Sequence, residues 1–364
     1  MVGGTRGAGS PVQAIRLPSG TPTVSLIVVV RNEEQYIETC LASVLAQDYP
    51  ADRVEILLVD GMSTDRTREQ ATAVLAARLA AGSARILDNP HAVSPTAMNI
   101  GIAAATGQAI MRVDGHTTLP LDYVRHCVEA LQATGSQCVG GAIRTRGSGA
   151  VGRAIAAAQS SRFGVGGVAF RTGCSTAGPV DTVPFGAYPR EVFAHIGGFD
   201  VELVRNQDDE LNFRLTQAGG TVWFDPVIST DYFCRSSLRR LWSQYFEYGA
   251  YKVRVAQKRH GFASVRHVVP AVFVVSAVAS LLLAAARREP GWALAVLGPY
   301  ALANAAASIA SAGSAQADPG RVAVAYAVLH TSYGTGLLAG LWRWRRGFLP
   351  TPTATKACGE ENGR

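Results

Sequence analysis

Three stretches without a charged residue follow His267, and they constrain the fold of this chain more than any other feature. They are Val268–Ala286, Gly291–Ala317 and Val322–Trp342. Each is long enough to cross about 30 Å of hydrocarbon as an α-helix. Soluble cores seldom contain three such runs in succession. We therefore predict a C-terminal α-helical membrane region at residues 268–346, with two or three transmembrane helices.

The number of membrane crossings stays open from the sequence. The middle stretch is rich in Ala, Ser and Gly, which fits a re-entrant segment or a helix packed inside a bundle. Three crossings would place Arg343, Arg345 and Arg346 opposite the N-terminal domain, against the tendency of Arg and Lys to stay cytoplasmic. Two crossings plus a re-entrant segment would remove that conflict.

The residues before this region have the composition of a soluble domain. The whole chain is 48% hydrophobic and 17% charged, with a mean hydropathy of +0.13, which fits a soluble domain joined to a membrane segment. Residues 1–22 contain no hydrophobic stretch, so we expect a disordered tail and no signal peptide. We expect a second tail at 347–364. The domain at 23–235 should then lie in the cytoplasm, at the inner (plasma) membrane.

Cysteine spacing and net charge argue against several classes of protein. The cysteines are Cys40, Cys127, Cys138, Cys174, Cys234 and Cys358. Their spacing fits neither a zinc site nor a disulfide framework. The net charge is +7, yet no basic helix or aromatic-basic motif for nucleic acid is present. Basic residues cluster before the first apolar stretch instead, which favours membrane lipid or a lipid phosphate as the partner.

The first 113 residues alternate between apolar runs and helical segments. Strands are predicted at Thr23–Val30, Val54–Val59, Arg85–Leu87 and Gln108–Val113. Such alternation is typical of an α/β domain with a mostly parallel, Rossmann-like sheet covered by helices on both faces. These sheets bind ligands beyond the carboxyl ends of their strands, where Asn32, Asp60 and Asp114 fall.

Asp60 ends the second predicted strand, in the stretch Asp60-Gly-Met-Ser-Thr-Asp65. One explanation is a tight turn and a helix N-cap. A carboxylate at the end of a strand also accepts hydrogen bonds from a ribose or a base, and we favour this nucleotide contact for Asp60. Glu33 lies at the first strand–helix junction, where it suits the helix dipole and is a second candidate nucleotide contact.

Asp114-Gly-His116 follows the fourth predicted strand and places two metal-binding side chains one residue apart. The glycine between them lets both turn toward one ion. Two side chains leave the coordination sphere of the ion incomplete, and the phosphate oxygens of a nucleotide diphosphate would complete it. Histidine in place of a second carboxylate favours Mn²⁺ over Mg²⁺. The alternative is a solvated turn before Pro120.

Three consecutive carboxylates, Asp208, Asp209 and Glu210, begin another predicted helix. Acidic side chains suit the first turn of a helix because they face its positive dipole end. Three of them exceed what capping requires, so one is a candidate general base.

Together these motifs resemble those of the inverting family 2 glycosyltransferases, which have the GT-A fold. The resemblance runs from about Val24 to Arg254. Its elements are Val30-Arg31-Asn32-Glu33-Glu34, Asp60-Gly-Met-Ser-Thr-Asp65, Met98-Asn99-Ile-Gly101, Arg112-Val-Asp114-Gly-His116, Asp181-Thr-Val-Pro-Phe-Gly186, Gly197-Gly-Phe-Asp200 and Asn206-Gln-Asp208.

The chain resembles in particular the membrane glucosyltransferases of succinoglycan-type exopolysaccharide assembly. This likeness rests on Asp181-Thr-Val, Arg190-Glu-Val-Phe, Arg205-Asn, Arg235-Ser-Ser-Leu and Gln244-Tyr-Phe-Glu-Tyr-Gly.

The resemblance implies a role for each candidate residue. Asp60 would contact the nucleoside, and Asp208 would be the catalytic base. Asp114 and His116 would hold a divalent cation, Mn²⁺ or Mg²⁺. Arg112 shares the motif of Asp114 and would join it in the nucleotide-sugar site.

The chain departs from the family pattern at two places. Gln207 stands where these enzymes usually have Glu, so this position contributes no charge. The Gln-x-x-Arg-Trp motif of processive synthases is absent, and we therefore expect one sugar to be transferred per encounter.

A basic segment at 236–267 precedes the first apolar stretch. It is either a solvated helix or an amphipathic helix that lies on the membrane and offers cations to a lipid diphosphate. The family likeness favours the second. Arg235, Gln244 and Arg254 are then candidate contacts of the acceptor or of its lipid phosphate.

The function that these expectations favour is sugar transfer in cell-surface or exopolysaccharide assembly. The donor would be a nucleotide-diphosphate sugar, with UDP-hexose expected, and the acceptor a polyprenyl-linked saccharide. Two alternatives stay open. One is a polyprenyl-phosphate sugar synthase, whose acceptor is the lipid phosphate itself. The other is a non-catalytic membrane scaffold, which Gln207 favours and the retention of Asp60, Asp114 and Asp208 argues against.

Overall fold

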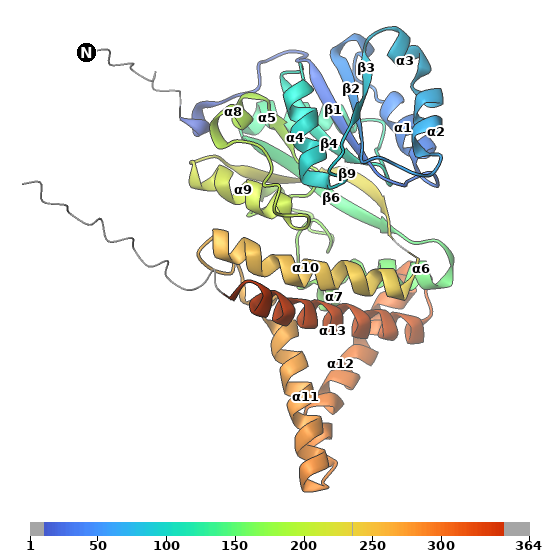
Figure 1. The fold of residues 1–364 in the computed structure, drawn as a ribbon, viewed down its shortest axis with the longest axis vertical. Coiled ribbons are helices and arrows are strands. Elements are labelled where there is room, and N and C mark those ends of the chain that lie inside the picture. Colours follow the sequence, from blue (N-terminus) through green and yellow to red (C-terminus); the bar gives the residue numbers. More distant parts are fainter. Residues whose placement is uncertain (1–10, 235, 346–364) are drawn as a thin grey trace, which may run out of the picture.

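The computed structural model describes residues 11–234 and 236–345, apart from the side chain at position 314. Figure 1 shows an α/β domain above two helices that lie side by side, α10 (Leu238–Lys258) and α13 (Pro319–Arg343). A hairpin of α11 (Val269–Arg287) and α12 (Gly291–Ala315) projects away from them. The expected order of an α/β domain followed by C-terminal helices is confirmed.

Four parallel strands form the half of the sheet that the sequence predicted. They are β1 (Val24–Val30), β2 (Val54–Asp60), β3 (Ala84–Asp88) and β4 (Ala109–Asp114), in the order β3-β2-β1-β4. In the register of the sheet, Val30 pairs with Asp60 and Val29 pairs with Asp114. Both aspartates therefore lie at the carboxyl edge of the sheet, on either side of β1.

Helices cover both faces of this half of the sheet. The helices are α1 (Ile37–Leu45), α2 (Thr67–Val74), α3 (Ala76–Ala80), α4 (Ser94–Ala104) and α5 (Tyr123–Thr134). Leu26 and Val28 of β1 pack in the cluster that contains α1 and α5, and Ile27 packs in the cluster that contains α4. Because alternate residues of β1 pack in different cores, both faces of the strand are buried and its sequence is mostly apolar without alternation.

The other half of the sheet is mixed, so the sheet as a whole is less parallel than the sequence indicated. Its strands are β5 (Thr117–Thr118), β6 (Cys138–Arg146), β7 (Gly178–Pro179), β8 (Ala187–Pro189) and β9 (Val222–Phe233). β8 is antiparallel to both β4 and β6, whereas β9 is parallel to β6. None of these strands was predicted from the sequence: β5, β7 and β8 have only two or three residues and carry no readable hydrophobic alternation, and the longer strands β6 and β9 were missed as well.

The remaining helices of the domain follow β6 and β8. They are α6 (Gly149–Gln159), α7 (Arg162–Val165), α8 (Glu191–Ile196) and α9 (Gln207–Gln217). Short 3₁₀ turns lie at Val12–Ala14, Ala51–Arg53 and Val265–His267, the last of which we term η3.

Residues 11–22, which the sequence analysis assigned to a disordered tail, pack against the domain. Val12, Ile15 and Leu17 are buried in its cores. Three apolar side chains in a short segment that contains Pro11, Pro18 and Pro22 give no periodic signal, so the sequence pattern does not predict their burial. The rest of that predicted tail and the predicted tail at 347–364 lie outside the described residues.

α13 lies against α10 through a seam of glycines. A Cβ added at Gly249 would lie 2.2 Å from the Tyr333 carbonyl oxygen, and one added at Gly336 would lie 2.1 Å from that of Phe246. At the far end, Gln257 Nε2 donates a hydrogen bond to the Trp344 carbonyl oxygen, at 2.6 Å. Small residues of this kind let two helix backbones approach closely. α13 is therefore bound to α10 along its length.

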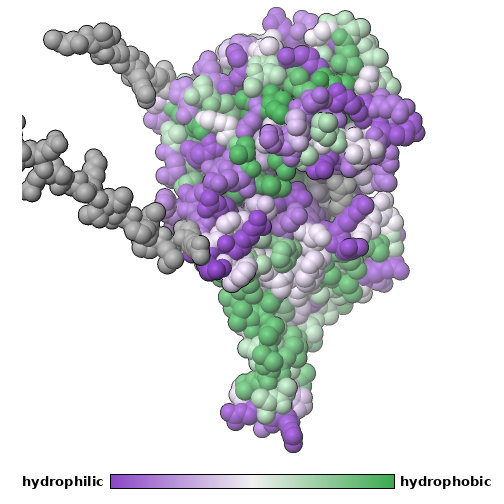
Figure 2. Space-filling view, viewed as in Figure 1, coloured by the Kyte–Doolittle hydropathy of each residue, from purple (hydrophilic) through white to green (hydrophobic). Residues whose placement is uncertain are grey.

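The hairpin has the dimensions and surface of a membrane-spanning unit. α11, α12 and α13 are all long and apolar enough to cross a membrane. In the apolar 18-residue stretch of each helix, 11% of the stretch is buried in α11 and in α12, against 44% in α13. The 19 residues of α11 span about 28 Å. Figure 2 shows a largely hydrophobic hairpin with hydrophilic residues at its tip, where Arg287, Arg288 and Glu289 lie. The hairpin is thus the most exposed apolar part of the described chain.

We expect Gly336→Ala to destabilise the protein by about 1–3 kcal/mol, the usual cost of overpacking. The added methyl group would force α13 away from α10. Gly298→Ala is the matched control, because nothing lies within 4 Å of its added Cβ. Thermal unfolding of both variants in detergent tests this. An equal melting temperature for the two would contradict the close packing of α13 against α10 at Gly336.

Candidate active site

One arginine joins the two carboxylates that the sequence placed in different parts of the site. Arg112 Nη1 of β4 donates to Asp208 Oδ1 and Oδ2 at 2.9 and 3.0 Å. Its Nε donates to Asp114 Oδ1 at 2.9 Å. The Arg112 side chain is 6% exposed, whereas those of Asp114 and Asp208 are 17% and 22% exposed. The candidate base at the start of α9 therefore lies beside the candidate metal-binding carboxylate at the end of β4.

Burial and charge act against each other within this cluster. Burial raises the pKa of Asp208 above its ordinary value, Arg112 opposes the rise, and Asp114 adds to it. Burial alone would lower the pKa of Arg112, but its two carboxylate partners raise it above the ordinary range. Arg112 is thus a fixed positive charge. Asp208 is a carboxylate whose proton affinity is increased, which suits a general base.

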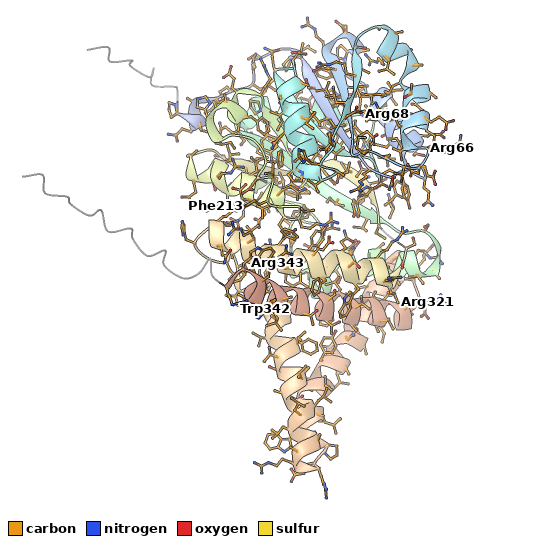
Figure 3. All side chains as sticks on the ribbon, viewed as in Figure 1. Arg66, Arg68, Phe213, Arg321, Trp342 and Arg343 are labelled. Carbon is orange, nitrogen blue, oxygen red and sulfur yellow. The ribbon has the colours of Figure 1, made fainter. Side chains whose placement is uncertain are left out.

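Asp60 ends β2 and is buried within the turn that follows. Its Oδ1 accepts hydrogen bonds from Ser63 N at 3.1 Å and Ser63 Oγ at 2.6 Å. Its Oδ2 lies 3.3 Å from Arg68, an α2 side chain labelled in Figure 3. The turn explanation therefore accounts for these contacts, and the nucleoside contact stays a prediction.

His116 and Glu33 meet at the carboxyl end of β1. His116 Nδ1 lies 3.0 Å from Glu33 Oε1, although this buried nitrogen forms no hydrogen bond. Among the described residues, no group of three His, Cys, Asp or Glu side chains could hold a metal. A buried imidazole nitrogen without a hydrogen bond, near carboxylates, fits a divalent cation whose other ligands come from the substrate. The residues thus fit a metal that is held jointly with a nucleotide diphosphate.

Several side chains around this cluster were not singled out from the sequence. The Phe185 ring lies 5.7 Å from Arg112 Cζ, and the Tyr232 ring packs edge-on against His116 at 5.0 Å. Phe185 adopts a φ of 51°, which is costly for a bulky residue. Its motif, Asp181-Thr-Val-Pro-Phe-Gly186, was noted as part of the family likeness, but no sequence pattern reveals the strained backbone.

Two of the candidate acceptor residues, Gln244 and Arg254, contact different partners. Gln244 Nε2 donates to the hydroxyl groups of Tyr232 and Tyr248 at 3.2 and 3.0 Å, on the side of His116. Arg254 pairs with Glu202 at 2.9 Å. Arg235 lies outside the described residues.

α10 is attached to α9 by a buried ion cluster. Asp209, adjacent to Asp208, pairs with Lys252 at 2.7 Å and with Arg259 at 2.9 Å. The Arg259 guanidinium also stacks over Phe213 of α9, at 4.5 Å, and Figure 3 shows Phe213 near α10. Consecutive residues of α9 therefore face different partners, Asp208 the sheet and Asp209 the membrane-proximal helix.

The sequence matches glycosyl transferase family 2 over residues 25–196. It is 33% identical to the succinoglycan biosynthesis protein ExoA of Rhizobium meliloti (strain 1021), over 90% of this chain and 97% of ExoA. It is 29% identical to the dolichyl N-acetyl-alpha-D-glucosaminyl phosphate 3-beta-D-2,3-diacetamido-2,3-dideoxy-beta-D-glucuronosyltransferase of Methanococcus voltae, over 65% of this chain and 74% of that enzyme.

Two solved structures share the fold. The mannosyltransferase PcManGT from Pyrobaculum calidifontis, in complex with GDP-Man and Mn²⁺, has a TM-score of 0.56 and 20% identity, over 92% of this chain and 90% of its own. TarS 1-349 of S. aureus, in complex with UDP-GlcNAc, has a TM-score of 0.51 and 16% identity, over 89% of this chain and 92% of the TarS chain. The domain has the GT-A fold, and the chain belongs to glycosyl transferase family 2.

Proposed function

We propose that this glycosyltransferase moves one sugar from a nucleotide-diphosphate sugar, with UDP-hexose as the expected donor, to a polyprenyl-linked saccharide in exopolysaccharide assembly. The observation that carries the proposal is the bridge from Asp208 through Arg112 to Asp114. It places a candidate base next to the strand end where a nucleotide diphosphate would bind.

In the proposed mechanism, Asp208 accepts the proton of an acceptor hydroxyl as that oxygen attacks the anomeric carbon. The bond to the nucleotide diphosphate breaks on the opposite face, so the configuration inverts. Arg112 holds Asp208 through two hydrogen bonds and fixes the direction of its lone pairs. The raised pKa of Asp208 strengthens it as a base.

Asp114 and His116 are the residues that would hold a divalent cation. Such an ion, when bound, neutralises the charge that develops on the departing diphosphate. Glu33 and Asp60 lie at neighbouring strand ends and would complete the nucleotide site. That PcManGT was solved with GDP-Man and Mn²⁺ supports both the donor class and the ion.

The relatives favour a sugar hydroxyl over a lipid phosphate as the acceptor. The Methanococcus voltae enzyme is named for transfer to a sugar that is already linked to dolichyl phosphate. ExoA is named for succinoglycan biosynthesis. Analysis of the lipid product tests this: a lipid that gains a sugar on a saccharide, with the anomeric configuration opposite to that of the donor, is expected. A sugar attached directly to the lipid phosphate, or retained configuration, would overturn the proposal.

The orientation we propose places the catalytic domain on the cytoplasmic side of the inner membrane. α11 and α12 would cross the bilayer as a hairpin, while α13 stays beside α10 under the domain. This arrangement keeps Arg343 and Arg345 on the side of the catalytic domain, as the positive-inside tendency favours.

We predict that Asp114→Ala abolishes metal-dependent nucleotide binding, because it removes the carboxylate expected to bind the ion. Titration of Mn²⁺ together with the nucleotide measures the effect. Asp122→Ala is the control, since Asp122 lies outside the site, 3.6 Å from His126. Undiminished binding by the Asp114 variant would refute the metal assignment.

A further inference from the structure

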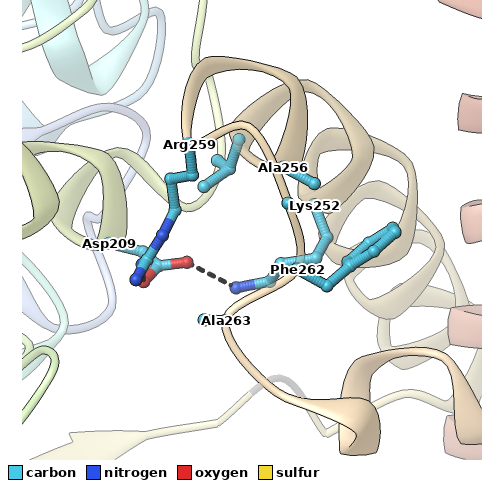
Figure 4. A pocket seen from close by; sticks show the side chains of 8 residues that line it. Asp209, Lys252, Ala256, Arg259, Phe262 and Ala263 are labelled. Atoms are coloured by element: carbon cyan, nitrogen blue, oxygen red, sulfur yellow. Dashed lines mark hydrogen bonds and ion pairs between the residues drawn. The ribbon is translucent and has the colours of Figure 1, made fainter. Parts of the chain in front are cut away.

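A group of mostly cationic side chains lies where the catalytic domain meets the membrane hairpin, and the mechanism above does not use it. We term it the junction cluster. It comprises Lys252 of α10, Arg259 directly after α10, Arg266 and His267 of η3, and Tyr333 of α13. Figure 4 shows Lys252 and Arg259 on either side of Asp209, in a hollow that Phe262 and Ala263 also line.

The junction cluster carries more positive charge than its own residues balance. Lys252 and Arg259 share a single carboxylate, Asp209, and the three side chains are 12–13% exposed. Arg266 forms no ion pair with any residue that the structure describes. Burial and the charge of Lys252 lower the pKa of His267 to about 3, with Arg266 and Arg259 adding to the effect. His267 is therefore neutral, and three cations face one carboxylate.

Three polar atoms of the cluster are buried without a hydrogen-bond partner. They are Arg266 Nε, His267 Nδ1 and the Tyr333 hydroxyl group. Asp209 and Arg266 both lie close enough to Tyr333 to act electrostatically on its hydroxyl group. A buried polar group that lacks a partner is costly, so such groups are expected to meet a ligand in the working protein. Guanidinium and hydroxyl donors in an excess of positive charge select for phosphate oxygens.

A glycine loop borders the same cluster. The aliphatic part of Arg266 packs over Gly166, where an added Cβ would lie 3.4 Å from Arg266 Cδ. Gly166 and Gly167 have φ values of 69° and 75°, which a residue with a side chain rarely adopts. The loop after α7 therefore approaches Arg266 closely and holds it at the start of α11.

The position of the cluster fits a ligand that is part lipid and part saccharide. Asp209 follows the candidate base Asp208 in α9, and η3 leads directly into α11. A diphosphate bound here would lie beside Asp209, one residue along α9 from the candidate base, with its hydrocarbon chain along the apolar hairpin. Resting on the function proposed above, we propose that the junction cluster binds the diphosphate of the polyprenyl-linked acceptor, with Arg266 as a principal contact.

The test measures binding of a fluorescent polyprenyl diphosphate by the full-length protein in phosphatidylcholine nanodiscs, without donor. Arg266→Gln should weaken binding by about tenfold or more, because a charge-assisted contact to phosphate is lost. Arg266→Lys should restore part of the affinity, since the charge returns without the planar fork. Arg287→Gln is the matched control, because Arg287 lies exposed at the other end of α11 and should bind as the wild type does.

Each further outcome supports or overturns the assignment. Equal affinity of wild type and Arg266→Gln would overturn it, provided that both bind the donor nucleotide equally well and are therefore folded. Displacement of the probe by phosphatidylglycerol at the same concentration as unlabelled polyprenyl diphosphate would mark a site for bilayer headgroups and overturn the acceptor assignment. Loss of binding in Arg266→Gln, together with absence of sugar transfer by the wild type, would retain the site and reject the proposed function.

Discussion

Asp208→Asn should lower kcat by about 10²–10⁴, the usual contribution of a positioned general base. The amide no longer accepts the proton of the acceptor hydroxyl, yet it keeps the size of the side chain and one acceptor oxygen for Arg112. Affinity for the donor nucleotide should change little, because Asp208 is not expected to contact it. Kinetics with saturating donor, together with direct nucleotide titration, separate the two effects. Equal turnover by the variant would reject Asp208 as the base.

The pH dependence of kcat is a second test of Asp208 as the base. The base acts when it is ionised, so activity is expected to fall as the pH falls through the raised pKa of Asp208. The acid limb of kcat should therefore lie above the ordinary range for aspartate, about 3.9. The residual activity of Asp208→Asn should lack this limb.

Arg112→Met is expected to destabilise the domain by about 3 kcal/mol, the lower end of the range for breaking a buried ion pair. The substitution leaves Asp114 and Asp208 facing each other without the intervening cation. Activity should fall by at least about tenfold, since the base loses the two hydrogen bonds that orient it and each is worth more than 1 kcal/mol. Thermal unfolding and turnover in detergent measure the two losses.

Arg112→Lys separates charge from geometry. A lysine keeps the positive charge, but its single nitrogen cannot reproduce separate contacts of Nη1 with Asp208 and of Nε with Asp114. Relative to Arg112→Met, Arg112→Lys should regain more of the lost stability than of the lost turnover. Wild-type turnover in this variant would show that Arg112 supplies charge and no orientation.

The sequence predicted the parallel half of the fold because each element there has a strong local signal. β1 and β2 are seven-residue strands of mostly apolar, buried residues, and each is followed by an amphipathic helix. The level register of these strands brought Asp60 and Asp114 to one edge, as the alternation of strands and helices indicated. The bounds of β1, β2 and β4 agree with the predicted ranges to within one residue at each end.

The parts that the sequence did not predict depend on contacts between distant residues. Arg112 and Asp208 are 96 positions apart, so no local pattern shows that one holds the other. The composition of α13 is that of a third membrane span, whereas its position beside α10 depends on the close approach of Gly249 to Tyr333 and of Gly336 to Phe246. Arg254 pairs with Glu202, and its contact with the acceptor stays a prediction, while Lys252 and Arg259 face α9.

The most direct test of the account is sugar transfer from a labelled nucleotide sugar to a polyprenyl-linked acceptor pool, in membranes that contain wild type, Asp208→Asn or the Asp122→Ala control. Release of nucleoside diphosphate is measured with Mn²⁺, with Mg²⁺ and with chelator. The account predicts that release requires the ion and the acceptor, favours one donor, persists in the control and collapses in Asp208→Asn. Release that is equal in wild type and Asp208→Asn, or no release with any donor, would contradict it.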